Sequence, residues 1–203
     1  MRTGTKIEKG ARPRGRPRGF ITSEVLDRVR DVFLAKGFAA ASLDELCAAA
    51  GLNRPSLYAA FGDKEQLYIS MLRHIGEKSV EAMDAVLSAP EPIEQRLGRL
   101  YKGAIDIYTR PPNPPGCIIV GTATVEATSH PAIGTAANQI LASFEKAFER
   151  GFIASALKPA PSPAERASMA GAILTATGIR ARLGVPAVEL RTFTKSMIPV
   201  ICR

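Results

Sequence analysis

The stretch from residue 42 to residue 64, SLDELCAAAGLNRPSLYAAFGDK, constrains the fold more than any other part of the chain. Ser42 with Glu45 three residues later forms a capping box, which predicts the start of a helix. Gly51 supplies the left-handed residue that ends it, and Asn53 is suited to cap a second short helix. Two short helices joined by a glycine turn, with polar residues exposed on the second, predict a helix-turn-helix, whose second helix enters a DNA major groove.

Apolar residues at helical spacing predict further helices on both sides of this unit. We expect the first helix to run from a Thr22 cap to about Lys36, where Gly37 ends it. A long helix over about 64–88 should link the helix-turn-helix to the remainder. Later helices are expected over about 93–109, 131–155, 164–183 and 187–201.

The run CIIVGTATVEA, residues 117–127, is ambiguous from its composition. Its β-branched residues alone favour a buried strand. The sequence offers no partner strand, however, and a lone strand cannot pair its backbone. Pattern alone therefore leaves strand and helix open at this position.

Thr22 to Tyr68 resembles the DNA-binding domain of the tetracycline-repressor (TetR) family of bacterial regulators. The matching segments are VLDRVRDVFLAKGF, ASLDELCAAAGL and SLYAAFGDKEQLY, of which the last is the most specific. The resemblance implies an all-α fold, with an N-terminal three-helix helix-turn-helix domain and a C-terminal helical domain for effector binding and dimerisation. It also implies that residues 117–127 are a buried helix. We expect a basic disordered arm over 1–19, the DNA-binding domain over 20–66 and the helical domain over 67–203.

Positive charge is concentrated at the N-terminus. The formal net charge is +8, and the first twenty residues hold seven Lys or Arg against one Glu, which accounts for +6. Such an arm suggests a polyanion, and nucleic acid fits best. A membrane surface would also attract it, but no amphipathic anchor follows. Arg14-Gly15-Arg16-Pro17 resembles the AT-hook core, which lies in a narrow A·T minor groove; the alternative is a solvated tail that attracts phosphates non-specifically.

The candidate DNA contacts lie on and around the second helix of the helix-turn-helix. Leu57 and Phe61 should face inward, which leaves the other side chains of that helix to face DNA. The resemblance also implies phosphate contacts at the preceding helix cap and at the start of the long helix. The predicted DNA contacts are Arg14, Arg16, Ser42, Arg54, Pro55, Ser56, Tyr58, Ala59 and Lys64. The alternative for each of them is a surface residue without a role in binding.

Two of these side chains have a specific expected role. Arg54 is suited to a guanine edge or a phosphate, and Tyr58 to a phosphate and a thymine methyl. Ala59 and Ala60 stand where the family often carries histidines or other polar residues. We therefore expect Arg54, methyl contacts and the arginine arm to carry the base preference.

An effector cavity is expected in the C-terminal domain. Cys117 is interpreted either as a redox or electrophile sensor or as a buried structural thiol. Glu126, if buried, needs a partner, which could be a ligand or a nearby arginine. The candidate lining residues, which could equally be plain core, are Leu72, Tyr101, Ile105, Tyr108, Cys117, Thr124, Glu126 and Phe144.

A homodimer through about 164–201 is expected, because a two-fold operator needs two DNA-binding domains. Small residues would allow the close helix approach that the resemblance implies: Gly171, Ala172, Thr175 and Gly178. The alternative is that these last helices only close the core of one protomer.

Other classes of protein find little support. No apolar run spans a bilayer, the N-terminus lacks a signal-peptide core, and three widely spaced cysteines favour a reducing cytoplasm. The family resemblance implies that this is the bacterial cytoplasm, at the nucleoid. His74 and His130 lack ligand-spaced neighbours, and no catalytic or phosphate-loop motif occurs, so we expect no catalytic residues, metal, cofactor or membrane partner.

The chain is interpreted as a DNA-binding transcriptional regulator, a repressor released from a palindromic operator by a small-molecule or reactive effector. The alternatives are an architectural DNA-binding protein without an effector, and a helical enzyme with an incidental basic tail.

Overall fold

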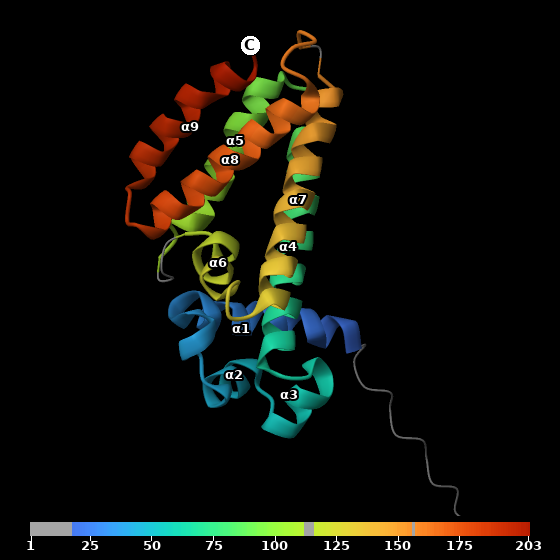
Figure 1. Cartoon of the computed structure of the whole chain (residues 1–203), viewed down its shortest axis with the longest axis vertical. Helices are drawn as coiled ribbons and strands as arrows, with labels where there is room; N and C mark the ends of the chain where they lie inside the picture. The colour runs from blue at the N-terminus through green and yellow to red at the C-terminus, as the bar shows by residue number, and fades with distance from the viewer. Residues whose placement is uncertain (1–17, 112–115, 156) are drawn as a thin grey trace, which may run out of the picture.

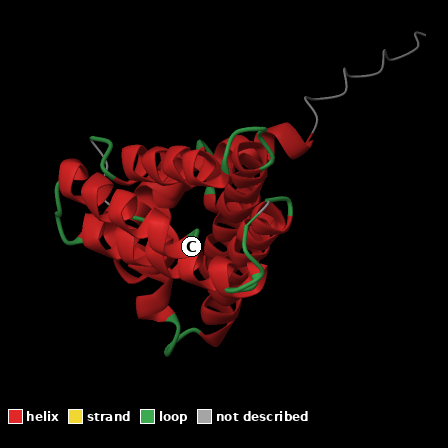
Figure 2. Ribbon diagram, turned by 90° about the horizontal axis from the view of Figure 1, so that it is seen from above, coloured by secondary structure: helices red, strands yellow, loops and turns green. Residues whose placement is uncertain are grey.

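The described part of the chain is all-helical, as the family resemblance implied. The computed structural model of the chain describes residues 18–111, 116–155 and 157–203. These residues form nine α-helices and one π-helical stretch, and none of them belongs to a strand (Figure 2). None of the helices so described is both long and apolar enough to cross a membrane.

Three N-terminal helices form a small unit, here called the head (Figure 1). They are α1 (Arg18–Ala40), α2 (Leu43–Ala50) and α3 (Arg54–Phe61). Helical geometry in α1 breaks at Gly37, which has φ 76° and ψ 177°. The prediction that Thr22 caps this helix is wrong, because the helix already begins at Arg18. A hydroxyl residue acts as a cap only where the chain before it leaves the helical conformation.

The predicted caps of α2 and α3 are confirmed. The Glu45 backbone N–H donates to Ser42 Oγ at 3.3 Å, and the Ser42 backbone N–H donates to Glu45 Oε2 at 3.1 Å, which completes the capping box. Gly51 takes the left-handed conformation, with φ 66°. The Asn53 and Asp63 side chains each accept a backbone N–H at the start of the next helix. These short-range bonds fix the directions of α2 and α3.

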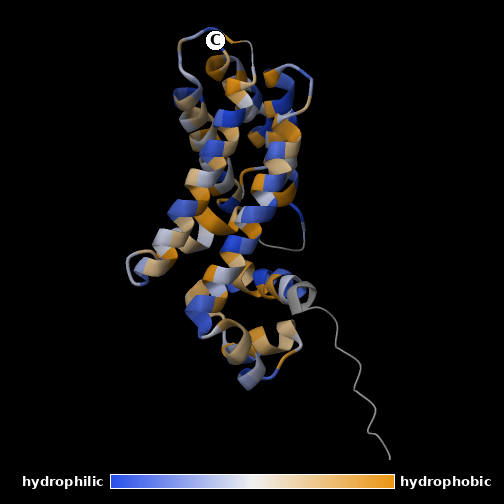
Figure 3. Ribbon diagram, turned by 90° about the vertical axis from the view of Figure 1, so that its right-hand side faces the viewer, coloured by the Kyte–Doolittle hydropathy of each residue, from blue (hydrophilic) through white to orange (hydrophobic). Residues whose placement is uncertain are grey.

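The remaining helices form the body, which α4 (Lys64–Leu87) joins to the head (Figure 1). The body contains α5 (Ile93–Tyr108), α7 (Pro131–Ile153), α8 (Pro163–Arg182) and α9 (Ala187–Ile201). Each helix carries hydrophobic and hydrophilic residues side by side (Figure 3), as amphipathic helices around a core do. Helix α4 packs along α7, and Gly76 permits that approach, because a Cβ there would lie 2.8 Å from Ile140 Cγ2. A single helix therefore contacts both head and body.

The ambiguous segment after Cys117 is helical, as the family resemblance implied, and not a strand. Residues Ile119–Ala123 form a π-helical turn (η1) that continues into the short α6 (Thr124–Glu126). Two hydroxyls support the backbone here: Thr122 Oγ1 donates to the Ile118 carbonyl at 2.6 Å, and Thr124 Oγ1 to the Val120 carbonyl at 2.7 Å. The sequence did not predict the wider π turn, a geometry that is frequent at functional sites.

Candidate nucleic-acid interface and effector cavity

Helix α3 presents one face to the head and another to the outside. Leu57 is 2% exposed and anchors the helix inward, with Phe61 half-buried beside the core. The predicted reading residues of α3 all lie on the outer face, where Tyr58 is 42% exposed: Arg54, Pro55, Ser56, Tyr58 and Ala59. Their exposure fits the predicted role, and contact with DNA stays a prediction.

Arg54 has an ion-pair partner that sequence reasoning missed. Its Nε and Nη2 atoms donate to Asp44 Oδ1 at 3.0 and 2.7 Å. The Asp44 hydrogen bond raises the pKa of Arg54 above its usual value. Asp44 lies in the first turn of α2 and Arg54 begins α3, so the turn between the helices brings them together. The sequence signal for this ion pair was an acidic residue in the first turn of α2 followed by an arginine at the start of α3.

Ser42 and Lys64, the two predicted phosphate contacts outside α3, already make bonds within the head. Ser42 Oγ donates to Glu45 Oε2 at 2.9 Å, and Glu45 also forms an ion pair with Lys36. Lys64 Nζ donates to the Ala39 carbonyl at 3.1 Å and lies 4.7 Å from the Phe38 ring centroid. Burial lowers the pKa of Lys64. Both residues are thus held at fixed places on the head surface.

The head itself is not basic. Residues 22–66 contain five Lys or Arg and seven Asp or Glu, a formal charge of −2, whereas residues 1–21 carry seven basic residues and one acid. The positive charge that could attract a polyanion such as DNA is therefore concentrated in the arm and not in the head. The predicted contacts Arg14 and Arg16 belong to that arm and lie outside the described residues.

Hydrogen bonds join the head and helix α4 to the η1 segment and to α8. The Tyr68 hydroxyl donates to Thr122 Oγ1 at 2.5 Å, since the hydrogen of that threonine is already directed to Ile118. Burial raises the pKa of Tyr68 to about 12. From α8, Arg182 Nη1 donates to the Leu34 carbonyl at 3.2 Å. This carbonyl lies in the last turn before Gly37, where backbone acceptors lack helical partners and a cation is favourable.

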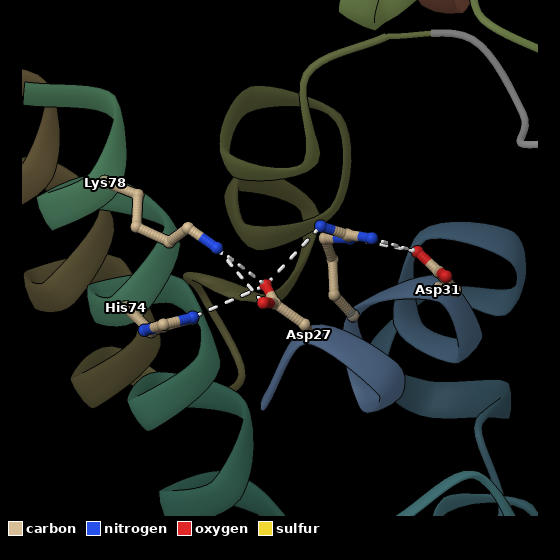
Figure 4. A network of polar contacts seen from close by, with 5 residues as sticks. Asp27, Asp31, His74 and Lys78 are labelled. Atoms are coloured by element: carbon tan, nitrogen blue, oxygen red, sulfur yellow. Dashed lines mark hydrogen bonds and ion pairs between the residues drawn. The ribbon is translucent and has the colours of Figure 1, made fainter. Parts of the chain in front are cut away.

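A charged cluster fixes α1 against α4 (Figure 4). Asp27 accepts a hydrogen bond from Lys78 Nζ at 3.1 Å and lies 3.4 Å from His74 Nε2 and 3.6 Å from Arg30 Nη1. Burial alone would raise the pKa of Asp27, but the Lys78 hydrogen bond and the neighbouring charges hold it below its usual value. The cluster keeps α1 aligned with the helix that runs into the body.

The second histidine connects the head to α7. His130, at the N-cap position of α7, donates from Nδ1 to Glu65 Oε2 at 2.6 Å. Its ring also packs edge-on against Phe38, with 4.7 Å between the ring centroids. Neither histidine contact was predicted from the sequence: His74 lies beside the Asp27 carboxylate of α1, and His130 binds the Glu65 carboxylate of α4.

A cavity of about 310 Å³ lies between α7, α8 and the segment that contains η1. Three of the eight predicted effector residues line it, namely Tyr108, Cys117 and Phe144. The Tyr108 hydroxyl contacts the Cys117 thiol, and desolvation raises the pKa of Tyr108. Lining residues that the sequence did not suggest include Leu141, Glu145, Ser168, Gly171, Ala172, Thr175 and Ile179.

The other five predicted effector residues lie away from this cavity. Leu72, Tyr101 and Ile105 are fully buried core residues, and the Tyr101 hydroxyl donates to the Ala170 carbonyl at 3.0 Å. Thr124 is exposed and Glu126 is half-buried near Lys64. Helical spacing identified buried faces but not the place where packing leaves space.

A wider groove of about 640 Å³ runs between α5 and α9 on the surface of the body. Its apolar floor includes Ile198 and Pro199, and Lys102 and Arg191 on its rim both bind Asp106, at 2.7 and 2.8 Å. In the described part of the chain no three His, Cys, Asp or Glu side chains gather as a metal site requires, and the three cysteines are free thiols.

Taken together, a capped helix-turn-helix with an exposed polar face is carried by α4 on an all-helical body. This combination defines a helix-turn-helix protein with a C-terminal helical domain. Residues 25–71 match the sequence profile of "Bacterial regulatory proteins, tetR family". Residues 25–71, which span most of the head and the first turns of α4, therefore belong to this family.

Individual relatives agree with that assignment. The chain is 32% identical over 114 residues to the HTH-type transcriptional repressor BdcR of Escherichia coli (strain K12), a match that spans 56% of this chain and 57% of BdcR. It is 30% identical over 128 residues to the repressor ComR of the same strain, across 63% of this chain and 60% of ComR. The matches therefore span less than two thirds of these curated relatives.

A solved structure matches over nearly the whole chain. A cysteine mutant of the TetR family transcriptional regulator CifR, complexed with 26-base-pair double-strand operator DNA, superposes with a TM-score of 0.72 and 26% identity. The match covers 93% of this chain and 98% of that one.

Proposed function

We propose that this chain is a DNA-binding transcriptional regulator, a repressor that a small-molecule or reactive effector releases from a palindromic operator. The observation that carries the proposal is the outer face of α3, which is exposed, carries the polar side chains of Arg54, Ser56 and Tyr58, and begins at the Asn53 cap. The operator complex of CifR and the repressor names of BdcR and ComR support it. In this role the DNA contacts are Ser42, Arg54, Pro55, Ser56, Tyr58, Ala59 and Lys64, with Arg14 and Arg16 in the arm.

Three functional segments follow from this proposal. Residues 1–19 supply electrostatic attraction, residues 20–66 read DNA, and residues 67–203 bind the effector and the second protomer. The charge difference between the arm and the head supports the first assignment. Such a regulator acts in the bacterial cytoplasm, at the nucleoid.

A homodimer through about 164–201 would place two heads on one operator. Large apolar side chains are exposed around the α8–α9 turn, where Leu183 is 78% and Val188 67% exposed, with Ile179 on the same end of α8. An exposed apolar patch of this kind is typical of a protein interface. Two-fold symmetry would then set the α3 helices about 34 Å apart, one turn of DNA.

The effector would act through the cavity beside Cys117. That cavity is bounded by η1, and η1 carries Thr122, which accepts the Tyr68 hydrogen bond. A ligand that displaces η1 would therefore move the start of α4 and the head, which is a coupling between two distinct sites. A reactive effector would meet the Cys117 thiol beside the Tyr108 hydroxyl.

Footprinting on the DNA upstream of the chain's own gene tests the regulatory role. We expect two protected half-sites about one helical turn apart. Uniform, weakly protected DNA would instead favour an architectural DNA-binding protein, and the repressor proposal would fail.

The cavity can be probed separately because the chain contains no tryptophan. A Leu141→Trp substitution places a single fluorophore in the lining. Compounds that release the wild-type protein from its operator should change this fluorescence. If releasing compounds leave the fluorescence unchanged, the effector site lies elsewhere.

A further inference from the structure

The ion pair between Asp44 and Arg54 joins two helix starts that are both capped. Both side chains are largely exposed, at 77% for Asp44 and 56% for Arg54. Asp44 is nevertheless held in place because the Ser42–Glu45 capping box fixes the first turn of α2. Arg54 is the first residue of α3, which the Asn53 cap fixes. Exposed ion pairs contribute little to stability, so the main effect of this pair is on the orientation of Arg54.

The pair leaves a defined set of hydrogen-bonding groups facing outward. A guanidinium has five N–H donors, and Arg54 uses two of them, on Nε and Nη2, for Asp44 Oδ1. Both Nη1 donors and one Nη2 donor remain. Two parallel N–H groups are the requirement for a bidentate contact to guanine O6 and N7. Arg54 can therefore read a guanine while it stays bound to Asp44.

Asp44 adds an acceptor of its own. Its Oδ2 atom makes no hydrogen bond within residues 18–111, 116–155 and 157–203. A carboxylate oxygen beside an arginine matches the cytosine N4 amino group next to a guanine edge. If α3 enters the major groove, the exposed Asp44 carboxylate also faces the polyanion, and its negative charge repels DNA phosphates. Asp44 should thus increase discrimination between bases while it lowers affinity for DNA in general.

We propose that Asp44 is a specificity-determining residue, which orients Arg54 to read a guanine and makes the pair selective for a G·C base pair. This inference rests on the proposed function, because it requires that α3 enters the major groove. It concerns the choice of base rather than the existence of binding. The inference is testable because the Asp44 carboxylate should increase discrimination between bases and lower the general affinity for DNA.

The experiment first selects preferred duplexes from a random pool with the full-length chain. Arg54→Ala then identifies the base pair that this side chain reads, as the position whose preference is lost. At that position the wild-type chain should prefer G·C about 5- to 150-fold, the range of one good bidentate contact. With Asp44→Ala, this preference should fall at least threefold, while affinity for an unrelated duplex stays the same or rises. The Asp44→Ala/Arg54→Ala double variant should discriminate no more than Arg54→Ala alone, because neither side chain of the pair remains to contact the base pair.

Two further variants control the measurement. Asp44→Asn keeps a side-chain oxygen acceptor without the charge, so its preference should lie between those of the wild type and Asp44→Ala. Glu91→Ala removes an exposed carboxylate that binds Arg99 at 3.0 Å on the body, and it should leave DNA binding unchanged. Circular dichroism establishes that each variant folds, and Asp44→Asn carries the test if Asp44→Ala does not.

The outcomes separate the inference from the proposed function. If Asp44→Ala raises affinity for all duplexes by one factor and keeps the G·C preference, Asp44 only repels phosphates and the inference is wrong. If the wild-type chain prefers no duplex, the proposed function fails and the inference fails with it.

Discussion

Replacing Gly178 with alanine should separate α8 from η1. Gly178 is buried in α8, and a Cβ at this position would lie 2.8 Å from Cys117 Cβ and 3.2 Å from Val120 Cγ2. Ordinary contacts begin at 3.4 Å, so the two segments must move apart by at least 0.6 Å. A methyl group forced into a packed contact costs about 1–3 kcal/mol. Alanine gains about 0.8–1.0 kcal/mol of helix propensity over glycine, which leaves a net destabilisation of about 0–2 kcal/mol.

Gly103→Ala is the matched control. Gly103 also lies inside a helix, α5, but a Cβ there meets nothing within 4 Å. This variant should be more stable than the wild type by about 0.8–1.0 kcal/mol, from helix propensity alone. The difference between the two variants therefore isolates the contact, at about 1–3 kcal/mol.

Urea unfolding followed by circular dichroism measures both variants. All samples need the same protomer concentration, because dimerisation would make the midpoint depend on it. Equal stabilisation by both substitutions would show that α8 and η1 are not in tight contact, and it would refute the coupling route from the cavity to Tyr68.

Three further predictions concern the head. The pKa of Glu45 is lowered to about 2 by hydrogen bonds from Lys36 and the Ser42 backbone. The stabilisation from ionised Glu45 is therefore complete above about pH 4.5 and is lost as the pH falls toward 2. Between these pH values the thermal midpoint of Glu45→Gln should fall less than that of the wild type. Lys64→Ala should weaken binding to all duplexes alike and reduce the salt-dependence slope by about one; a change in base preference would contradict a phosphate role. Deleting residues 1–18 should lower affinity and weaken the preference for A·T-rich flanks; unchanged affinity and preference would rule out a role for Arg14 and Arg16.

Features set by short stretches of sequence were predictable. The Ser42–Glu45 box, the Gly51 turn and the Asn53 cap each depend on residues within a few positions, and the structure confirms all three. The start of α1 was not predictable from Thr22, because a hydroxyl residue is compatible with both a cap and a helix interior. Local signals decide a boundary only when the chain on one side of them cannot continue the helix.

Features that depend on distant residues were not predictable. Tyr68 and Thr122 are 54 positions apart, and no local pattern pairs them. The π turn over Ile119–Ala123 packs against Gly178 of α8, and no local pattern in the sequence indicates this contact. Ile105 and Tyr108 belong to the same helix, yet only Tyr108 reaches the cavity.

The most direct measurement is fluorescence anisotropy of the full chain on the DNA upstream of its own gene, against a scrambled duplex, over a series of salt concentrations. We expect a strong preference for the upstream duplex that persists as salt rises, with two protomers bound per site, and its loss in Tyr58→Ala. Equal binding to both duplexes, falling steeply with salt and unaffected by Tyr58→Ala, would contradict sequence reading by α3 and leave the basic arm as the source of binding.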